Sequence, residues 1–180
     1  MNEIYCRWLT VTCLLAFSLV PLTLLGEVTE SATDGFQIVM RETTQLNPQD
    51  AYRVMVEEFS QWYDASHSYG GVPQNLALDL ERHAMLEQLP EGGFVRHMEI
   101  VFHQPGKVLR MTGGLGPLQG MGVSGALTFA FQPVESGTEI TLTYQVSGSS
   151  LAHLDKIAGP VDGVLTTQLK RLKNQCDKQP

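Results

Sequence analysis

Aromatic and hydrogen-bonding side chains gather in one short stretch between predicted elements. They are Trp62, Tyr63, His67 and Tyr69. Large apolar area combined with a few polar groups is the mixture that orients an amphipathic ligand at the mouth of a cavity. A structural reading stays open for Trp62 and Tyr63, which could fill the gap between a helix and a sheet. For Asp64 the structural reading is favoured, because a loop Asp bonds nearby backbone.

A strand predicted from Phe94 to His103 carries the second group. Simple alternation places Arg96 and Met98 on the face toward a cavity, and His97 and Glu99 on the solvent face. An arginine on an apolar inner face must be paired or must bind an anionic group, so Arg96 is a candidate partner for a carboxylate. The alternative is that Arg96 reaches solvent from the end of the strand.

Catalytic and metal-binding patterns are weak. His97 and Glu99 could act as a base with its orienting group or as two metal ligands, but no third ligand stands at a suitable spacing. No G-x-S-x-G motif is present. The glycine-rich segment 113–125 lacks the spacing of a phosphate-binding loop and is read as a turn that could close over a cavity. The sequence therefore predicts no catalytic residue, no metal and no cofactor.

Charge argues against nucleic acid as a partner. The 180 residues carry a formal charge of −7, and the twelve Lys and Arg are scattered. The only basic cluster is Lys170, Arg171 and Lys173. Nucleic-acid binders need concentrated positive charge, so we expect none to bind.

The N-terminus is typical of a secretory signal. Arg7 precedes an uncharged, mostly apolar run from Trp8 to Leu25, and a polar stretch follows. Residues 1–26 are predicted to be a signal peptide, cut near Gly26 or after Ser18, which makes the protein periplasmic or secreted. The alternative is an uncleaved anchor in the inner membrane, because this run of 18 residues is just long enough to span a bilayer.

Cys176 is the one cysteine outside that segment. It cannot form an internal disulfide there, so we read it as part of a polar tail, residues 176–180, with an intermolecular bridge as the alternative.

The remaining elements predict one α+β domain over residues 35–175. A strand from Gly35 leads to a helix at Pro48, with Asn47 as its N-cap, and to a second short helix near residues 56–63. About six antiparallel strands follow, and a long amphipathic helix from Pro160 closes the chain. The apolar stripe of this last helix is Val161, Val164, Leu165, Leu169 and Leu172.

The order of these elements and several short sequence segments match those of a known superfamily. They are residues 48–51, Trp62-Tyr63, Gly92-Gly93, residues 105–110, residues 113–120 and the helix from Pro160. In these the chain resembles the SRPBCC superfamily, which includes START-like lipid carriers, polyketide cyclase-like proteins and the Hsp-ATPase-activator-like group. The resemblance implies a helix-grip fold, in which a curved antiparallel sheet wraps the C-terminal helix and leaves an elongated apolar cavity.

The expected function is to hold a small hydrophobic or amphipathic molecule in that cavity. The residues predicted to face such a ligand are Trp62, Tyr63, His67, Tyr69, Arg96, Met98, Phe129, Tyr144 and Leu165. Two alternatives stay open because the superfamily is functionally diverse. One is a cyclase- or dehydratase-like enzyme that uses the same cavity, and the other is a protein-interaction module of the cell envelope.

Overall fold

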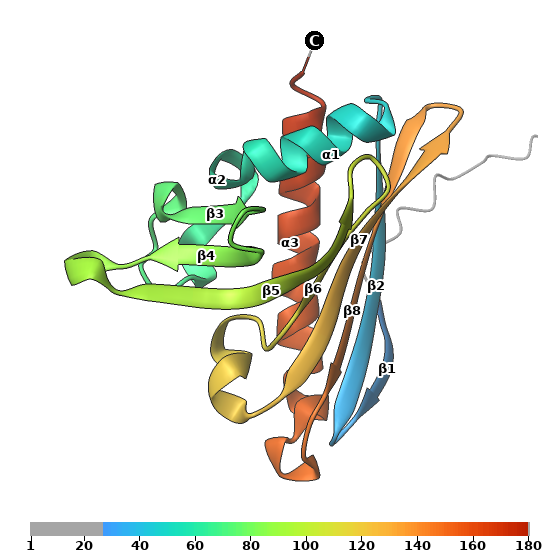
Figure 1. Cartoon of the computed structure of the whole chain (residues 1–180). Coiled ribbons are helices and arrows are strands. Elements are labelled where there is room, and N and C mark those ends of the chain that lie inside the picture. The colour runs from blue at the N-terminus through green and yellow to red at the C-terminus, as the bar shows by residue number, and fades with distance from the viewer. Residues whose placement is uncertain (1–26, 180) are drawn as a thin grey trace, which may run out of the picture.

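A computed structural model describes residues 27–179 and shows an eight-stranded antiparallel sheet curved around one long helix (Figure 1). The strands are β1 (Glu27–Ala32), β2 (Gly35–Thr44), β3 (Leu76–Asp79), β4 (Ala84–Gln88), β5 (Phe94–Gln104), β6 (Val108–Thr112), β7 (Ser124–Val134) and β8 (Gly137–Ser147). The helices are α1 (Pro48–Glu57), α2 (Phe59–Trp62) and α3 (Ala158–Cys176). The predicted α+β helix-grip fold is confirmed.

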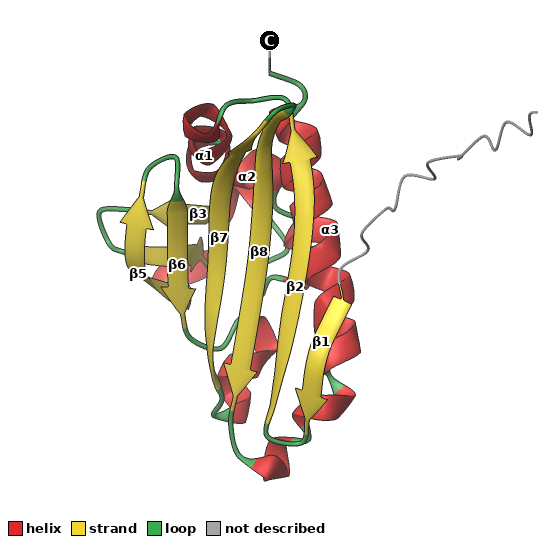
Figure 2. Ribbon diagram, turned by 90° about the vertical axis from the view of Figure 1, so that its right-hand side faces the viewer, coloured by secondary structure: helices red, strands yellow, loops and turns green. Residues whose placement is uncertain are grey.

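The order of strands across the sheet is β1-β2-β8-β7-β6-β5-β4-β3. The N-terminal strands therefore join the sheet beside the last strand, and the middle of the chain forms the opposite edge. Figure 2 shows β2, β8 and β7 as a long ladder with α3 behind it. In Figure 1, β3, β4 and β5 bend away from that ladder, and α1 and α2 cross one end of α3.

The faces of β7 and β8 follow the predicted alternation. Leu127 and Phe129 on β7 are buried, as are Leu142 and Tyr144 on β8, whereas Thr143 and its neighbours on the outer face are partly exposed. Side chains two residues apart on a strand share a face, so the inner side chains of both strands point the same way. They belong to one buried cluster together with the apolar side chains of α1, α3 and β2.

The start of α1 also matches the sequence. The Asn47 side chain accepts a hydrogen bond of 3.0 Å from the backbone N–H of Asp50, and Pro48 occupies the first turn, where no donor is needed. The second helix is shorter than predicted, since α2 covers only Phe59–Trp62.

Strand β1 was not predicted. Its sequence is mostly polar, yet it pairs with β2 from Glu27↔Val39 to Ala32↔Gly35, so the sheet begins before the expected start at Gly35. An edge strand has a partner on one side only and does not need an alternating apolar pattern. The predicted signal or anchor, residues 1–26, lies outside the described residues. Within residues 27–179, no helix is long and apolar enough to cross a bilayer.

The assignment of Cys176 to a polar tail was wrong. Cys176 is the last residue of α3, and its side chain is fully buried in the core. In this fold the thiol is not available for a bridge to another chain.

Candidate ligand-binding site

A cavity of about 500 Å³ lies between α3 and the glycine-rich segment that joins β6 to β7. We call residues 113–122 the lid segment; it contains the short 3₁₀ helix η4 (Gly116–Met121). The cavity is lined by Tyr63, His67, His97, Leu115, Gly116, Pro117, Leu118, Met121, Ile157, Pro160, Val161, Val164 and Leu165. Only three of these side chains carry polar atoms, so the cavity suits a largely apolar molecule.

Helix α3 supplies one wall of the cavity. Val161, Val164 and Leu165 belong to the apolar stripe predicted for this helix, and their helical spacing places them on one side. Leu169 and Leu172, in the C-terminal half of the same stripe, are buried in the core. The same face of α3 therefore lines the cavity in its N-terminal half and packs into the core in its C-terminal half.

Three sets of hydrogen bonds hold the lid segment in place. The backbone N–H of Leu115 donates to the Tyr144 hydroxyl at 3.1 Å, and the Tyr69 hydroxyl donates to the carbonyl of Gly116 at 3.4 Å. The Gln119 amide donates to the carbonyls of Arg96 and His97. The lid segment is thus fastened to β8, to the loop after α2 and to β5, and it closes the cavity on the side opposite α3.

Strand β5 departs from simple alternation, and this changes which of its side chains reach the cavity. Met98 pairs with Met85 and Arg96 pairs with Leu86, so His97 is an extra residue between two consecutive pairs. Such a β-bulge reverses the facing of the residues on one side of it. His97 is consequently buried and lines the cavity, whereas Arg96 is exposed and does not. The predicted positions of His97 and Arg96 were both wrong.

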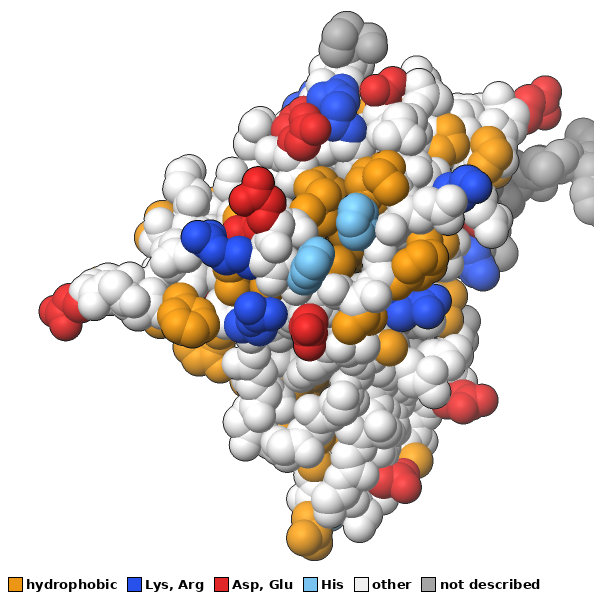
Figure 3. All heavy atoms as spheres, in the orientation of Figure 1, with side chains coloured by type: hydrophobic (Ala, Val, Ile, Leu, Met, Phe, Trp, Pro, Cys, Tyr) orange, Lys and Arg blue, Asp and Glu red, His pale blue; other side chains and the backbone are white. Residues whose placement is uncertain are grey.

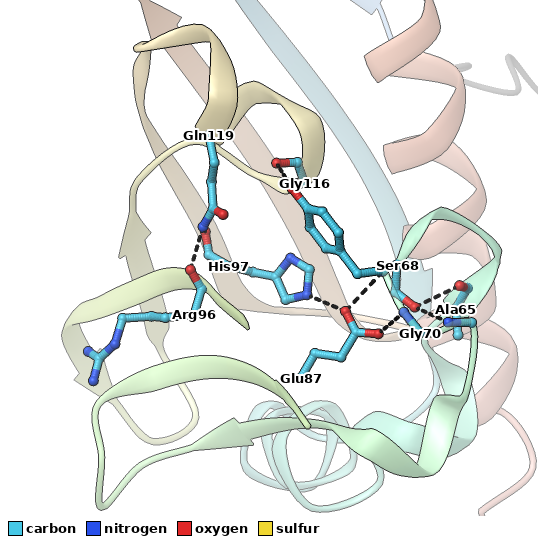
Figure 4. A network of polar contacts seen from close by, with 10 residues as sticks. Ala65, Ser68, Gly70, Glu87, Arg96, His97, Gly116 and Gln119 are labelled. Carbon is cyan, nitrogen blue, oxygen red and sulfur yellow. Dashed lines mark hydrogen bonds and ion pairs between the residues drawn. The ribbon is translucent and has the colours of Figure 1, made fainter. Parts of the chain in front are cut away.

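His97 is held by a buried carboxylate on the neighbouring strand. Its Nε2 lies 2.9 Å from Oε2 of Glu87, and the two side chains are 2% and 0% exposed. Glu87 also accepts hydrogen bonds from the backbone N–H groups of Tyr69, at 3.0 Å, and Gly70, at 2.6 Å. Figure 4 shows this network, with the second ring nitrogen of His97 pointing away from Glu87 and toward the side where Gly116 lies.

Hydrogen bonding keeps Glu87 ionised. Burial raises the pKa of this carboxyl, but the hydrogen bonds from Gly70, Tyr69 and His97 outweigh burial and lower it overall. An ionised carboxylate only accepts, so Nε2 of His97 must carry the proton. In the neutral form of the imidazole Nδ1 is then an acceptor, and this buried atom has no hydrogen-bond partner among the described residues.

The aromatic stretch divides between core and cavity. Trp62 is 2% exposed, and its indole N–H donates to the carbonyl of Met55 at 3.0 Å, so it fills the core. Asp64 accepts from the backbone N–H of Ser66 at 2.9 Å, which agrees with the structural reading. Tyr63 lines the cavity, and burial, with the charge of Glu87, raises the pKa of its hydroxyl, which therefore stays neutral.

The other predicted ligand residues lie in different places. His67, in the short helix η1 (Ala65–His67), lines the cavity, as Leu165 does. Tyr69 is 57% exposed, with its ring centroid 5.9 Å from that of His97. The remaining predicted residues are buried in the core and do not line the cavity: Met98, Phe129 and Tyr144.

Sequence reasoning missed Glu87 and the contribution of the lid segment. One signal was present, because Glu87 is the only charged residue in the otherwise mostly apolar strand β4. A charged residue within a buried strand needs a partner, and the next strand, β5, carries two histidines, His97 and His103.

Charged side chains form no cluster at this site or on the face drawn in Figure 3. In residues 27–179, no three His, Cys, Asp or Glu side chains come together as metal ligands. Figure 3 shows basic and acidic side chains interspersed around hydrophobic ones over the face that carries α1 and β5.

Comparison with known proteins identifies the fold. No protein-family model matches the chain, and no curated protein matches its sequence. Among solved structures, a protein from Mesorhizobium loti superposes with a TM-score of 0.56 at 15% identity, over 80% of this chain and 98% of that one. An uncharacterised protein from Rhizobium leguminosarum gives 0.56 at 17% identity, over 81% and 97%. A protein of unknown function from Enterococcus faecalis gives 0.59 at 12%, over 85% and 77%. At these identities the likeness is one of fold alone.

Proposed function

We propose that this protein is an exported member of the SRPBCC superfamily that holds a small hydrophobic or amphipathic molecule in the cavity beneath the lid segment. The observation that carries the proposal is the cavity itself, about 500 Å³ with ten of its thirteen lining residues apolar or glycine. This volume falls within the range of about 300–1,000 Å³ that is usual for small-molecule sites. A concave, largely apolar space of this size is the usual form of a small-molecule site.

The export part of the proposal rests on the N-terminal sequence. The basic residue, apolar run and polar stretch of residues 1–34 have the order of a secretory signal. Strand β1 begins at Glu27, so cleavage near Gly26 would leave the whole sheet in the mature protein. Intact-mass measurement on protein purified from the cell envelope distinguishes a cut chain from an uncleaved anchor.

Native mass spectrometry combined with organic extraction tests the binding function directly. Protein purified from its own envelope fraction is expected to carry a lipid-like or polyketide-like mass. Protein that is empty, and stays empty against a panel of lipids and other apolar molecules, would contradict the proposal.

A pair of matched variants places the bound molecule. Val164→Phe puts a large ring into the cavity wall, whereas Thr167→Phe puts the same ring on the exposed face of the same helix. We expect Val164→Phe to abolish co-purification of the ligand and Thr167→Phe to retain it. Equal retention by both variants would show that the molecule binds elsewhere.

An acid–base enzyme is the second candidate, and the Glu87–His97 pair favours it. A histidine oriented by a carboxylate, with its other nitrogen free to accept a proton, is the arrangement of a general base. The extracted molecule, once known, tests this directly. Its chemical conversion by the wild-type protein, lost in His97→Phe, would favour an enzyme, and its release unchanged would favour a carrier.

A further inference from the structure

We infer that the polar group of the bound molecule is an uncharged hydrogen-bond donor, a hydroxyl, which donates to Nδ1 of His97. This inference rests on the proposed binding function and adds the chemical class of the ligand. It is carried by Nδ1 of His97, a buried atom of a cavity-lining residue that has no hydrogen-bond partner within residues 27–179.

The hydrogen-bonding role of that atom is fixed by Glu87. The carboxylate receives three donors, the backbone N–H groups of Tyr69 and Gly70 and the Nε2–H of His97. In the neutral form of the imidazole, whose one proton the carboxylate holds on Nε2, Nδ1 presents a lone pair. Only a donor can satisfy it.

Leaving this acceptor empty is costly. A buried polar group without a hydrogen bond loses its interaction with water and gains nothing in return. His97 occupies this position because a bulge in β5 turns it inward, next to an apolar wall of Leu115, Leu118 and Leu165. A ligand that places its apolar body against this wall and its hydroxyl at Nδ1 removes the cost.

The charges around the cavity disfavour an anionic ligand. Within residues 27–179, no Lys or Arg lines it, and Arg96, the predicted partner of a carboxylate, is exposed on the other face of β5. A carboxylate at Nδ1 would meet a lone pair, with the negative charge of Glu87 behind the ring. A fatty acid anion is therefore a poor fit, and an alcohol of the same length is a good one.

Tyr69 links the ring of His97 to the lid segment. Its ring lies beside the imidazole, with the centroids 5.9 Å apart, and its hydroxyl makes one long hydrogen bond of 3.4 Å to Gly116 in the lid segment. The side chain is 57% exposed and has room to turn outward. Breaking that single bond releases the lid segment from the loop after α2.

Titration calorimetry with three probes of equal chain length tests the inference. Decanol can donate a hydrogen bond, decyl methyl ether can only accept one, and decanoate carries a charge. We expect the wild-type protein to bind decanol roughly tenfold more tightly than the ether, the value of one good hydrogen bond. Decanoate is expected to bind more weakly than decanol at neutral pH.

Two variants assign the preference to His97. His97→Phe keeps a ring but removes the acceptor, so decanol and the ether should bind alike. His103→Phe, an exposed position on the same strand that does not line the cavity, should keep the tenfold preference. The comparison of decanol with its ether in the wild-type protein stands by itself if His97→Phe does not fold.

The outcomes separate this inference from the proposed function. Equal binding of decanol and the ether to the wild-type protein would overturn the inference while leaving the cavity as a binding site. Tighter binding of decanoate than of decanol would overturn it in the same way. If none of the probes binds, the proposed function and the inference both fail.

Discussion

Replacing Glu87 by Gln tests the claim that a buried carboxylate organises this site. The substitution keeps size and shape but exchanges one oxygen for an NH₂ group. The two carboxylate oxygens have different partners, since Oε1 accepts from Gly70 while Oε2 accepts from Tyr69 and His97. Whichever way the amide is turned, its NH₂ group faces at least one N–H donor.

The expected loss follows from those contacts. At least one charge-assisted hydrogen bond disappears from a side chain that is 0% exposed, and such bonds contribute about 1.5–3 kcal/mol. We therefore expect Glu87→Gln to lower the free energy of unfolding by about 2–3 kcal/mol. For a protein of this size, that corresponds to a fall of roughly 5–10 °C in melting temperature.

Urea unfolding followed by circular dichroism measures the difference, with Glu99→Gln as the matched control. Glu99 lies on the adjacent strand and is exposed, so its replacement should change stability by less than about 0.5 kcal/mol. A loss for Glu87→Gln as small as that of the control would refute the reasoning.

The pH dependence of the same pair gives a second check. The pKa of Glu87 is lowered in the folded protein, so its stabilising effect is complete above its ordinary pKa of 4.5 and is lost as the pH falls through the folded value. The difference in free energy of unfolding between the wild type and Glu87→Gln should stay constant from neutral pH down to about 4.5. Below that pH the difference should become smaller. A gap that widened in acid would contradict the assignment of an ionised carboxylate.

Three further predictions concern other buried groups. Tyr144→Phe removes the acceptor of the Leu115 N–H, so it should cost about 1–2 kcal/mol and speed amide hydrogen exchange in the lid segment; unchanged exchange there would count against the role of Tyr144. Burial raises the pKa of Asp162 above its ordinary value of 3.8, which means that the folded state loses stability as the carboxyl ionises. Asp162→Asn should therefore raise the melting temperature by about 2 °C at neutral pH and leave it unchanged in acid, and a neutral-pH decrease would be the wrong sign. Burial raises the pKa of the Cys176 thiol to about 12, so iodoacetamide should label it only after denaturation, as peptide mass spectrometry would show; labelling of the native protein would mean that the end of α3 opens.

The fold could be predicted from the sequence where a local pattern determines structure without help from the rest of the chain. Asn47-Pro48 specifies the start of α1 by its own hydrogen-bonding chemistry. The alternation of apolar and polar residues in β7 and β8 indicates that one face of each strand is buried. Strand β1 shows the opposite case. Its polar residues carry no such pattern, and it is a strand because β2 offers a free edge.

The site was harder to predict because it depends on a bulge. Period-two reasoning assigned Arg96 to the cavity and His97 to solvent, and one extra residue in β5 exchanged the two. A bulge is set by the pairing of β5 with β4, which a single sequence does not reveal. The importance of Glu87 likewise depends on a partner from another strand and on backbone N–H groups of a distant loop.

The strand order has a consequence for how the protein folds. β2 occupies an interior place in the sheet only through β8, with Gly35 opposite Ser147 and Thr44 opposite Thr138. About a hundred residues must be synthesised between these partners, and pairing across such a separation carries a large loop-closure cost. The N-terminal strands therefore cannot pair with β8 until almost the whole chain has been synthesised. We expect slow, late folding that is completed only when β8 and α3 are available, and a chain that ends before β8 should not fold.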